Sequence, residues 1–246
     1  MRRLLPWLAV PALLILPHAA WAQSVTLDLG GSGNAGATGR LVQLTALITL
    51  LSLAPSLLIM VTAFTRIVVV MSLLRSALGL QGVPPNTVLI GLSLFLTFNV
   101  MEPTLLASWN EGVLPLIDGR IGEMEGLARA AEPFRRFMTA NLRGADLQLF
   151  LDLGNLPAPA TPDTAPWRAL VPAFMVGELR RAFEMGFLIA LPFLVIDFVV
   201  GSVLMGLGMM MLPPAAVSLA FKLVFFVLVD GWRLIAGSLA QSFQSG

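Results

Sequence analysis

The sequence predicts an all-α fold of the membrane type, with two long helical hairpins whose helices are broken at prolines. Hydrophobic residues make up 57% of the 246 positions and charged residues only 12%, and the mean hydropathy is +0.86. The apolar residues form long uncharged runs, which come as two pairs, each turning at a Pro-Pro doublet. Runs of this length suit helices buried in a bilayer or a membrane complex.

The first 22 residues have the pattern of a secretory signal peptide. A basic start precedes an apolar run over residues 4–16, and Ala20-Trp21-Ala22 fits a small-x-small cleavage site. A membrane anchor is the alternative, but Pro6 and Pro11 interrupt the run, Pro17 follows it directly, and it is too short to span. We therefore expect the mature N-terminus outside the cytoplasm, followed by a flexible Gly- and Ser-rich lead over residues 23–40.

The first predicted hairpin covers residues 41–102. Its first run, Leu41 to Thr65, has no charged residue and as a helix would be about 37 Å long, enough to span. Pro55 predicts a kink or break inside it. The hairpin turns at Pro84-Pro85, and the second run ends at Glu102-Pro103.

A charged central region, residues 103–170, separates the two hairpins. Of the 29 charged residues in the chain, 19 lie between Glu102 and Glu184, so this part should be solvated. Residues 126–142 have the pattern of an amphipathic helix packed on its own domain. Four prolines between Leu156 and Pro166 indicate a linker.

The second predicted hairpin covers residues 171–246. Its apolar run ends at Pro213-Pro214 and resumes from Ala215 to Val229, so the two hairpins together offer four helices that could span. The signal peptide and the positive-inside rule agree on the orientation. Both place the N-terminus and the central region in the periplasm and the two Pro-Pro turns toward the cytoplasm, in a bacterial inner membrane.

Several ionisable residues lie in or beside these apolar helices. Burying such a charge in hydrocarbon costs at least about 2.5 to 3.5 kcal/mol, so each needs a partner or access to water. Arg66 and Arg75 have an ordinary interfacial alternative, and so do Asp230 and Arg233 at a helix end. Asp197 and Lys222 lie deeper in their runs, with partners that the sequence leaves open. The predicted set is Arg66, Arg75, Asp197, Lys222, Asp230 and Arg233.

Methionines gather immediately before the second Pro-Pro turn, at Met205, Met209, Met210 and Met211. Met205 and Met209 would share a helix face at this spacing. Flexible, uncharged thioethers can deform around a passing chain and reseal behind it, as a permeability gasket must. Ordinary core packing is the alternative, although broken helices at membrane depth commonly line cavities.

The composition argues against an enzyme and against a cofactor. The chain has no Cys, and its one His, His18, lies in the predicted signal peptide, so triads and the commoner metal sites are excluded from the mature chain. No phosphate-binding Gly-rich loop occurs. The positive charges are scattered, which argues against a nucleic-acid partner.

Two long strings resemble the FliP family of flagellar type III export proteins, which is related to the SctR proteins of injectisomes. The first is LSLAPSLLIMVTAFTRIVVVMSLLRSALGLQGVPPNTVLIGLSLFLTFNVMEP, from Leu51 to Pro103, and the second runs from Val171 to Phe243. Together they cover about half of the chain. Within the PAFxxxE pattern, the Glu is Glu178, and Gly177 stands where the family usually has a polar residue.

The resemblance implies an all-helical homopentamer that joins FliQ and FliR subunits in a closed, ring-like helical gate, with FlhB nearby. Unfolded flagellar proteins would leave the cytoplasm through this gate at the basal body. Met209, Met210 and Met211 would correspond to the Met-rich gasket of the family. The resemblance also implies that the helices stand largely out of the bilayer plane in the mature assembly.

Two other functions remain open from the sequence. One is the gate of an injectisome, the same machine with virulence cargo. The other is a secondary transporter or ion channel, with Asp197 and Lys222 on the ion path. A transporter should be a self-sufficient monomer or dimer, whereas a gate should be a ring with partner subunits.

Overall fold

The computed structural model describes residues 59–209 and 211–243 and, before them, residues 42, 44–46, 48–49, 52–53 and 56. The predicted signal peptide, the lead over residues 23–40, Pro55 and Met210 lie outside the described residues. The chain divides after Ser52, and every helix named below belongs to residues 53–246. The described part contains helices and no strand, which confirms the predicted all-α class.

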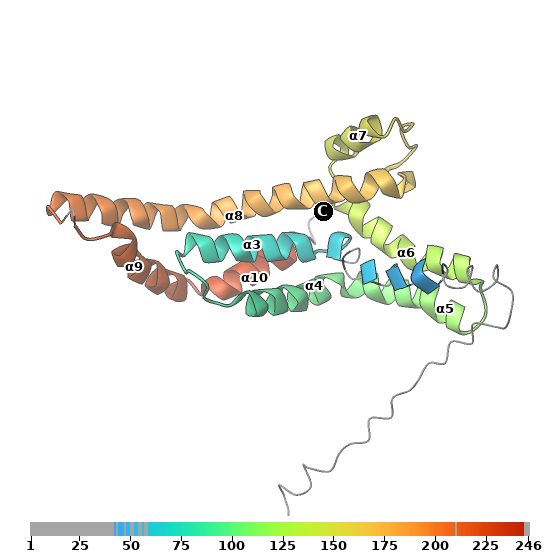
Figure 1. Cartoon of the computed structure of the whole chain (residues 1–246), viewed down its shortest axis with the longest axis horizontal. Helices are drawn as coiled ribbons and strands as arrows, with labels where there is room; N and C mark the ends of the chain where they lie inside the picture. The colour runs from blue at the N-terminus through green and yellow to red at the C-terminus, as the bar shows by residue number, and fades with distance from the viewer. Residues whose placement is uncertain are drawn as a thin grey trace, which may run out of the picture. The chain divides into compact units, whose positions relative to one another are not determined.

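The described helices follow one another with short connections (Figure 1). In chain order they are α3 (Phe64–Ala77), α4 (Asn86–Ser108), the π-helix η1 (Trp109–Val113), α5 (Leu114–Ile117), α6 (Glu123–Ala140), α7 (Gly144–Leu153), the 3-10 helix η2 (Pro162–Thr164), α8 (Trp167–Gly206), α9 (Pro214–Leu228) and α10 (Gly231–Gln241). Each Pro-Pro doublet lies at the start of a helix rather than in its interior. Pro85 precedes α4, and Pro214 is the first residue of α9, where its missing N–H costs nothing.

The main core forms around α3, which packs between α8 and α4 (Figure 1). Its buried face repeats at helical spacing, with Ile67, Val70, Met71 and Leu74 all almost fully buried. The other helices contribute one or two buried residues each to this core, among them Met101 of α4, Phe193 of α8, Phe226 of α9 and Leu239 of α10. The helix that carries Arg66 is therefore the most enclosed part of the fold.

A second core joins α6 and α7 to the first half of α8. It contains Met138 of α6, Leu147 and Leu151 of α7, and Leu170 and Phe174 of α8. The charged central region is thus packed on the same long helix that continues into the second apolar run. Figure 1 shows α7 lying against the first part of α8, and α6 extending away from that part toward α5.

The sequence predicted that the second apolar run ends at Glu102-Pro103, but the helix that contains it does not end there. α4 continues through Pro103 to Ser108 and is extended by η1 and α5. Proline removes only one backbone donor, and both flanking turns are held by tertiary contacts. Met101 is buried against α3 on one side, and on the other Ser108 Oγ donates a 2.7 Å hydrogen bond to the carbonyl of Ala130 in α6.

The crossing of η1 and α6 needs a glycine at position 112. A Cβ at Gly112 would lie 2.3 Å from the backbone nitrogen of Ala130, so no larger residue fits without moving the helices apart. An ion pair of 2.5 Å between Glu111 and Arg136 closes the same crossing. α6 is therefore anchored to α4 and η1 from Ala130 to Arg136.

Two helical stretches in the described part are long and apolar enough to cross a membrane, Asn86–Ile117 and Trp167–Gly206. α9 and α10 add a third candidate if the 64° bend between them belongs to one broken span. The structure describes the first predicted run, residues 41–65, only in part, and a turn at Val61–Ala63 separates residues 59 and 60 from α3, which begins inside the run at Phe64. Of the most apolar 18-residue stretch of α8, only 11% is buried within this chain. Most of the apolar surface of this stretch is therefore open to lipid or to other subunits.

Candidate functional site

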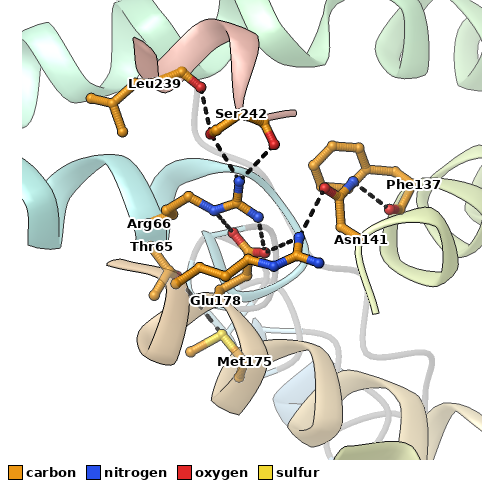
Figure 2. Close-up of polar contacts among 9 residues, drawn as sticks. Thr65, Arg66, Phe137, Asn141, Met175, Glu178, Leu239 and Ser242 are labelled. Atoms are coloured by element: carbon orange, nitrogen blue, oxygen red, sulfur yellow. Dashed lines mark hydrogen bonds and ion pairs between the residues drawn. The ribbon is translucent and has the colours of Figure 1, made fainter. Parts of the chain in front are cut away.

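A buried ion pair between Arg66 and Glu178 lies at the junction of α3 and α8 (Figure 2). Arg66 Nη2 lies 2.5 Å from Glu178 Oε1, and Arg66 Nε donates a 2.8 Å bond to Oε2, so the contact is bidentate. The side chains are 1% and 0% exposed. α3 begins directly after the turn at Val61–Ala63, and Arg66 is among the buried residues of its first turn. Removing one partner of a pair this deeply buried strongly destabilises the fold, because the other charge stays buried without a counter-charge.

Further polar groups complete the shell around this pair (Figure 2). Arg66 Nη1 donates to the carbonyl and to the hydroxyl of Ser242, at 3.1 and 2.9 Å. Arg181 Nη1 lies 4.0 Å from Glu178 Oε1 and donates to Asn141 Oδ1 at 3.4 Å. Burial lowers the pKa of Arg66 from its ordinary value, and the hydrogen bond and charge of Glu178 act in the opposite direction. The guanidinium thus has an acceptor at each of its three nitrogens.

A second ion pair joins α8 and α9 in their apolar stretches. Lys222 Nζ lies 2.6 Å from Asp197 Oδ2 and donates a 3.1 Å bond to the carbonyl of Ala77. Ala77 is the last residue of α3, where a cation also complements the helix dipole. The Lys222 side chain is 7% exposed, but that of Asp197 is 40% exposed. The single Lys of the chain therefore fixes three helices to one another.

The other predicted charged residues belong to neither pair. Arg75 closes the turn between α3 and α4 by donating to Asn86 Oδ1 at 2.6 Å and to the carbonyl of Pro84 at 3.3 Å. Asp230 adopts a left-handed conformation, with φ +51°, at the bend between α9 and α10. Arg233 is exposed and has no ion pair with the rest of the described chain.

The methionines surround the open turn between α8 and α9. Met211 is 99% exposed, Met205 61% and Met209 44%. The predicted shared helix face of Met205 and Met209 is wrong, because α8 ends at Gly206. Gly208, with φ +72°, takes the left-handed conformation that ends many helices, so Met209 leaves the helix axis.

The structure adds an unpartnered carboxylate that the sequence did not indicate. Asp146 Oδ2, at the start of α7, is buried without a hydrogen-bond partner among the described residues. It faces Gly177 of α8, where a Cβ would lie at an ordinary contact distance of 3.4 Å. Ser242, Asn141 and Asp146 all belong to common residue types, and no sequence signal marked them.

A hydroxyl placed at position 177 should give this carboxylate its missing donor. We expect Gly177→Ser to raise the free energy of unfolding by about 1 kcal/mol more than Gly177→Ala, which gains only helix propensity. Thermal unfolding of the purified protein measures both. In an Asp146→Ala background the advantage of Ser over Ala should vanish. Equal stability of the Ser and Ala variants in the native background would contradict this assignment.

A sequence model described as the FliP family matches residues 47–239, which include both ion pairs and the methionine turn. The chain belongs to the FliP family. It is 56% identical to a flagellar biosynthetic protein FliP of Caulobacter vibrioides over 240 residues, 97% of this chain and 90% of that protein. Similar proteins of the same name occur in Agrobacterium fabrum, at 48% over 96% of this chain and 97% of that protein, and in Bacillus subtilis, at 50% over 82% and 91%.

Membership of the FliP family agrees with the apolar helices and confirms the resemblance drawn from the two strings. The family match ends at residue 239, before Ser242 and Phe243. Among the described residues, no three His, Cys, Asp or Glu side chains are grouped so that they could hold a metal ion. The site is therefore built from helix-to-helix ion pairs and an exposed apolar turn.

Proposed function

We propose that this protein is a core subunit of the flagellar type III export gate, the channel through which unfolded flagellar proteins are secreted. The observation that carries this proposal is the match to the FliP family over residues 47–239, with relatives named flagellar biosynthetic proteins. Its role is structural and transport-related rather than enzymatic. It acts in the membrane, a location that its long apolar helices support.

The exposed apolar surface supports assembly with other subunits. Phe183, Phe187 and Phe198 of α8 are each more than half exposed, and so are Val227 and Leu228 of α9. We propose that copies of the chain form a homopentameric ring, joined by FliQ and FliR and adjacent to FlhB. Such faces would be covered in the ring or by lipid.

The proposed chain plan keeps the predicted segments. Residues 1–22 are a signal peptide, 23–40 a flexible lead, 41–102 the first hairpin, 103–170 the periplasmic region and 171–246 the second hairpin. The N-terminus and central region face the periplasm. The methionine turn between α8 and α9 then lies toward the cytoplasmic side.

Met209, Met210 and Met211 are proposed to form the gasket that keeps the resting gate closed to ions. Met211 supports this role because its side chain is 99% exposed at the tip of the turn. A fully exposed apolar side chain gains nothing from the core of its own chain. It can therefore pack against equivalent residues of neighbouring subunits.

Replacing Met209, Met210 and Met211 together by Ser should raise ion leakage through the assembled gate several-fold while assembly persists. Small polar side chains leave the ring open and hydrated. Ion flux in proteoliposomes containing the complete gate measures the leak. Met124→Ser is the matched control, because Met124 is 81% exposed on α6, away from the turn. Leakage equal to that of the control would remove the gasket role.

Two experiments, one on cells and one on the purified particle, separate the three functions. A deletion strain should lose motility and export of flagellar subunits, whereas an injectisome subunit would leave motility intact. Mass measurement of the detergent-extracted particle should give a ring with helical partners. A monomer or dimer that carries a small solute after reconstitution would support the transporter instead.

A further inference from the structure

The last two described residues, Ser242 and Phe243, lie beside the Arg66–Glu178 pair. α10 ends at Gln241, and Ser242 then accepts two hydrogen bonds from Arg66 Nη1 through its carbonyl and hydroxyl oxygens. The same hydroxyl donates to the carbonyl of Leu239 at 2.8 Å. Figure 2 shows Ser242 and Leu239 on one side of Arg66, with Phe137 and Asn141 on the other.

Phe243 connects this ion pair to α6. The Arg66 guanidinium carbon lies 3.7 Å from the centroid of the Phe243 ring. The ring also stacks on Phe137 of α6, with centroids 6.0 Å apart and an interplanar angle of 25°. Phe137 in turn contacts Phe174 of α8 edge-on, at 5.8 Å. Phe243 thus contacts α3 and α6 directly, and α8 through Phe137.

The middle and the last turns of α6 are held in different ways. Its middle is anchored to α4 and η1 at Ala130, through Ser108 and Gly112, and its last turns have one ion pair with η1, between Arg136 and the half-exposed Glu111. The last turns are also held by Phe137 and by Met138, which is buried against α7 and α8. Without the contact to Phe243, the last turns would lose their one aromatic link to the C-terminal segment.

From these contacts we infer that Ser242 and Phe243 form a C-terminal clasp, which holds the last turns of α6 against the α3–α8 ion pair. The clasp sets how the charged central region is placed on the two apolar hairpins. It also makes this placement depend on α10, because Ser242 and Phe243 directly follow that helix. The inference does not rest on the export function.

Local hydrogen exchange tests the clasp in the complete purified particle. Two separate variants, Phe243→Ala and removal of residues 242–246, should each speed amide exchange at residues 134–141, in the last turns of α6, by about tenfold. The reason is that each loses the aromatic contact with Phe137 and the apolar burial that comes with it. Exchange in α9 should stay within about twofold of the native value. Removal of residues 245 and 246 alone is the matched control and should change neither.

A milder variant keeps the test decisive if the truncated chain does not fold. Phe243→Leu keeps most of the buried apolar volume but loses the ring stacking on Phe137 and the contact with the Arg66 guanidinium. It should speed exchange at residues 134–141 alone, by a smaller factor. Unchanged exchange in α6, or an equal increase in α6 and α9, would overturn the inference.

Discussion

Replacing Glu178 by Ala should lower the free energy of unfolding by about 3 to 5 kcal/mol, the largest stability effect we expect from one side chain. The substitution leaves the Arg66 guanidinium, 1% exposed, with neutral acceptors only. A marginally stable protein loses a large share of its stability by such a change. Thermal or denaturant unfolding of the purified particle measures the effect, and a lower yield of assembled particles should accompany it.

Glu184→Ala is the matched control for this prediction. Glu184 lies on the same helix, but its side chain is 57% exposed and its pair with Arg180 is an i,i+4 surface contact. Its removal should cost less than about 1 kcal/mol. The double variant Arg66→Met with Glu178→Met should recover much of the loss, because no unpaired charge remains buried. Equal losses for Glu178→Ala and Glu184→Ala would show that the buried pair does not stabilise this junction.

The sequence identified the charged residues but not how they pair. Arg66, Asp197 and Lys222 stood out because an isolated charge in an apolar helix is costly. Glu178 was marked only by the family pattern. Helical periodicity tells which face a residue occupies, but not which helix lies opposite. The partners of the two ion pairs are 112 and 25 positions apart, so their contacts depend on the tertiary packing of α3, α8 and α9.

Helix ends were the other feature that local patterns predicted poorly. Pro103 suggested a stop, yet packing of η1 against α6 carries the helix onward. Two glycines after Met205 ended α8 earlier than the apolar run suggested, which moved Met209 off the helix. Ser242 and Phe243 gave no signal because their role depends on the contact of the segment after α10 with Arg66 of α3. Class and family were predictable, and the meeting points of helices were not.

Replacing Asp197 should lower the free energy of unfolding more than replacing Lys222, because the Lys222 side chain is the more deeply buried of the two. Asp197→Ala leaves the Lys222 ammonium, 7% exposed, with the carbonyl of Ala77 as its remaining acceptor. We expect a loss of about 3 kcal/mol. Lys222→Met keeps the length and apolar stem of the side chain and leaves a carboxylate that is 40% exposed. That carboxylate is solvated, so we expect a loss of about 1 kcal/mol.

Motility should also be reduced more by Asp197→Ala than by Lys222→Met. The ion pair matters for the gate because Lys222 links the end of α3 to α9, the helix that follows the methionine turn. Thermal unfolding of the particle and swimming of complemented cells measure the two consequences. Arg233→Met is the matched control, since Arg233 is exposed and should change stability by less than about 0.5 kcal/mol. If Lys222→Met were the more damaging variant, the hydrogen bond to Ala77, rather than the charge balance with Asp197, would be what holds α9 in place.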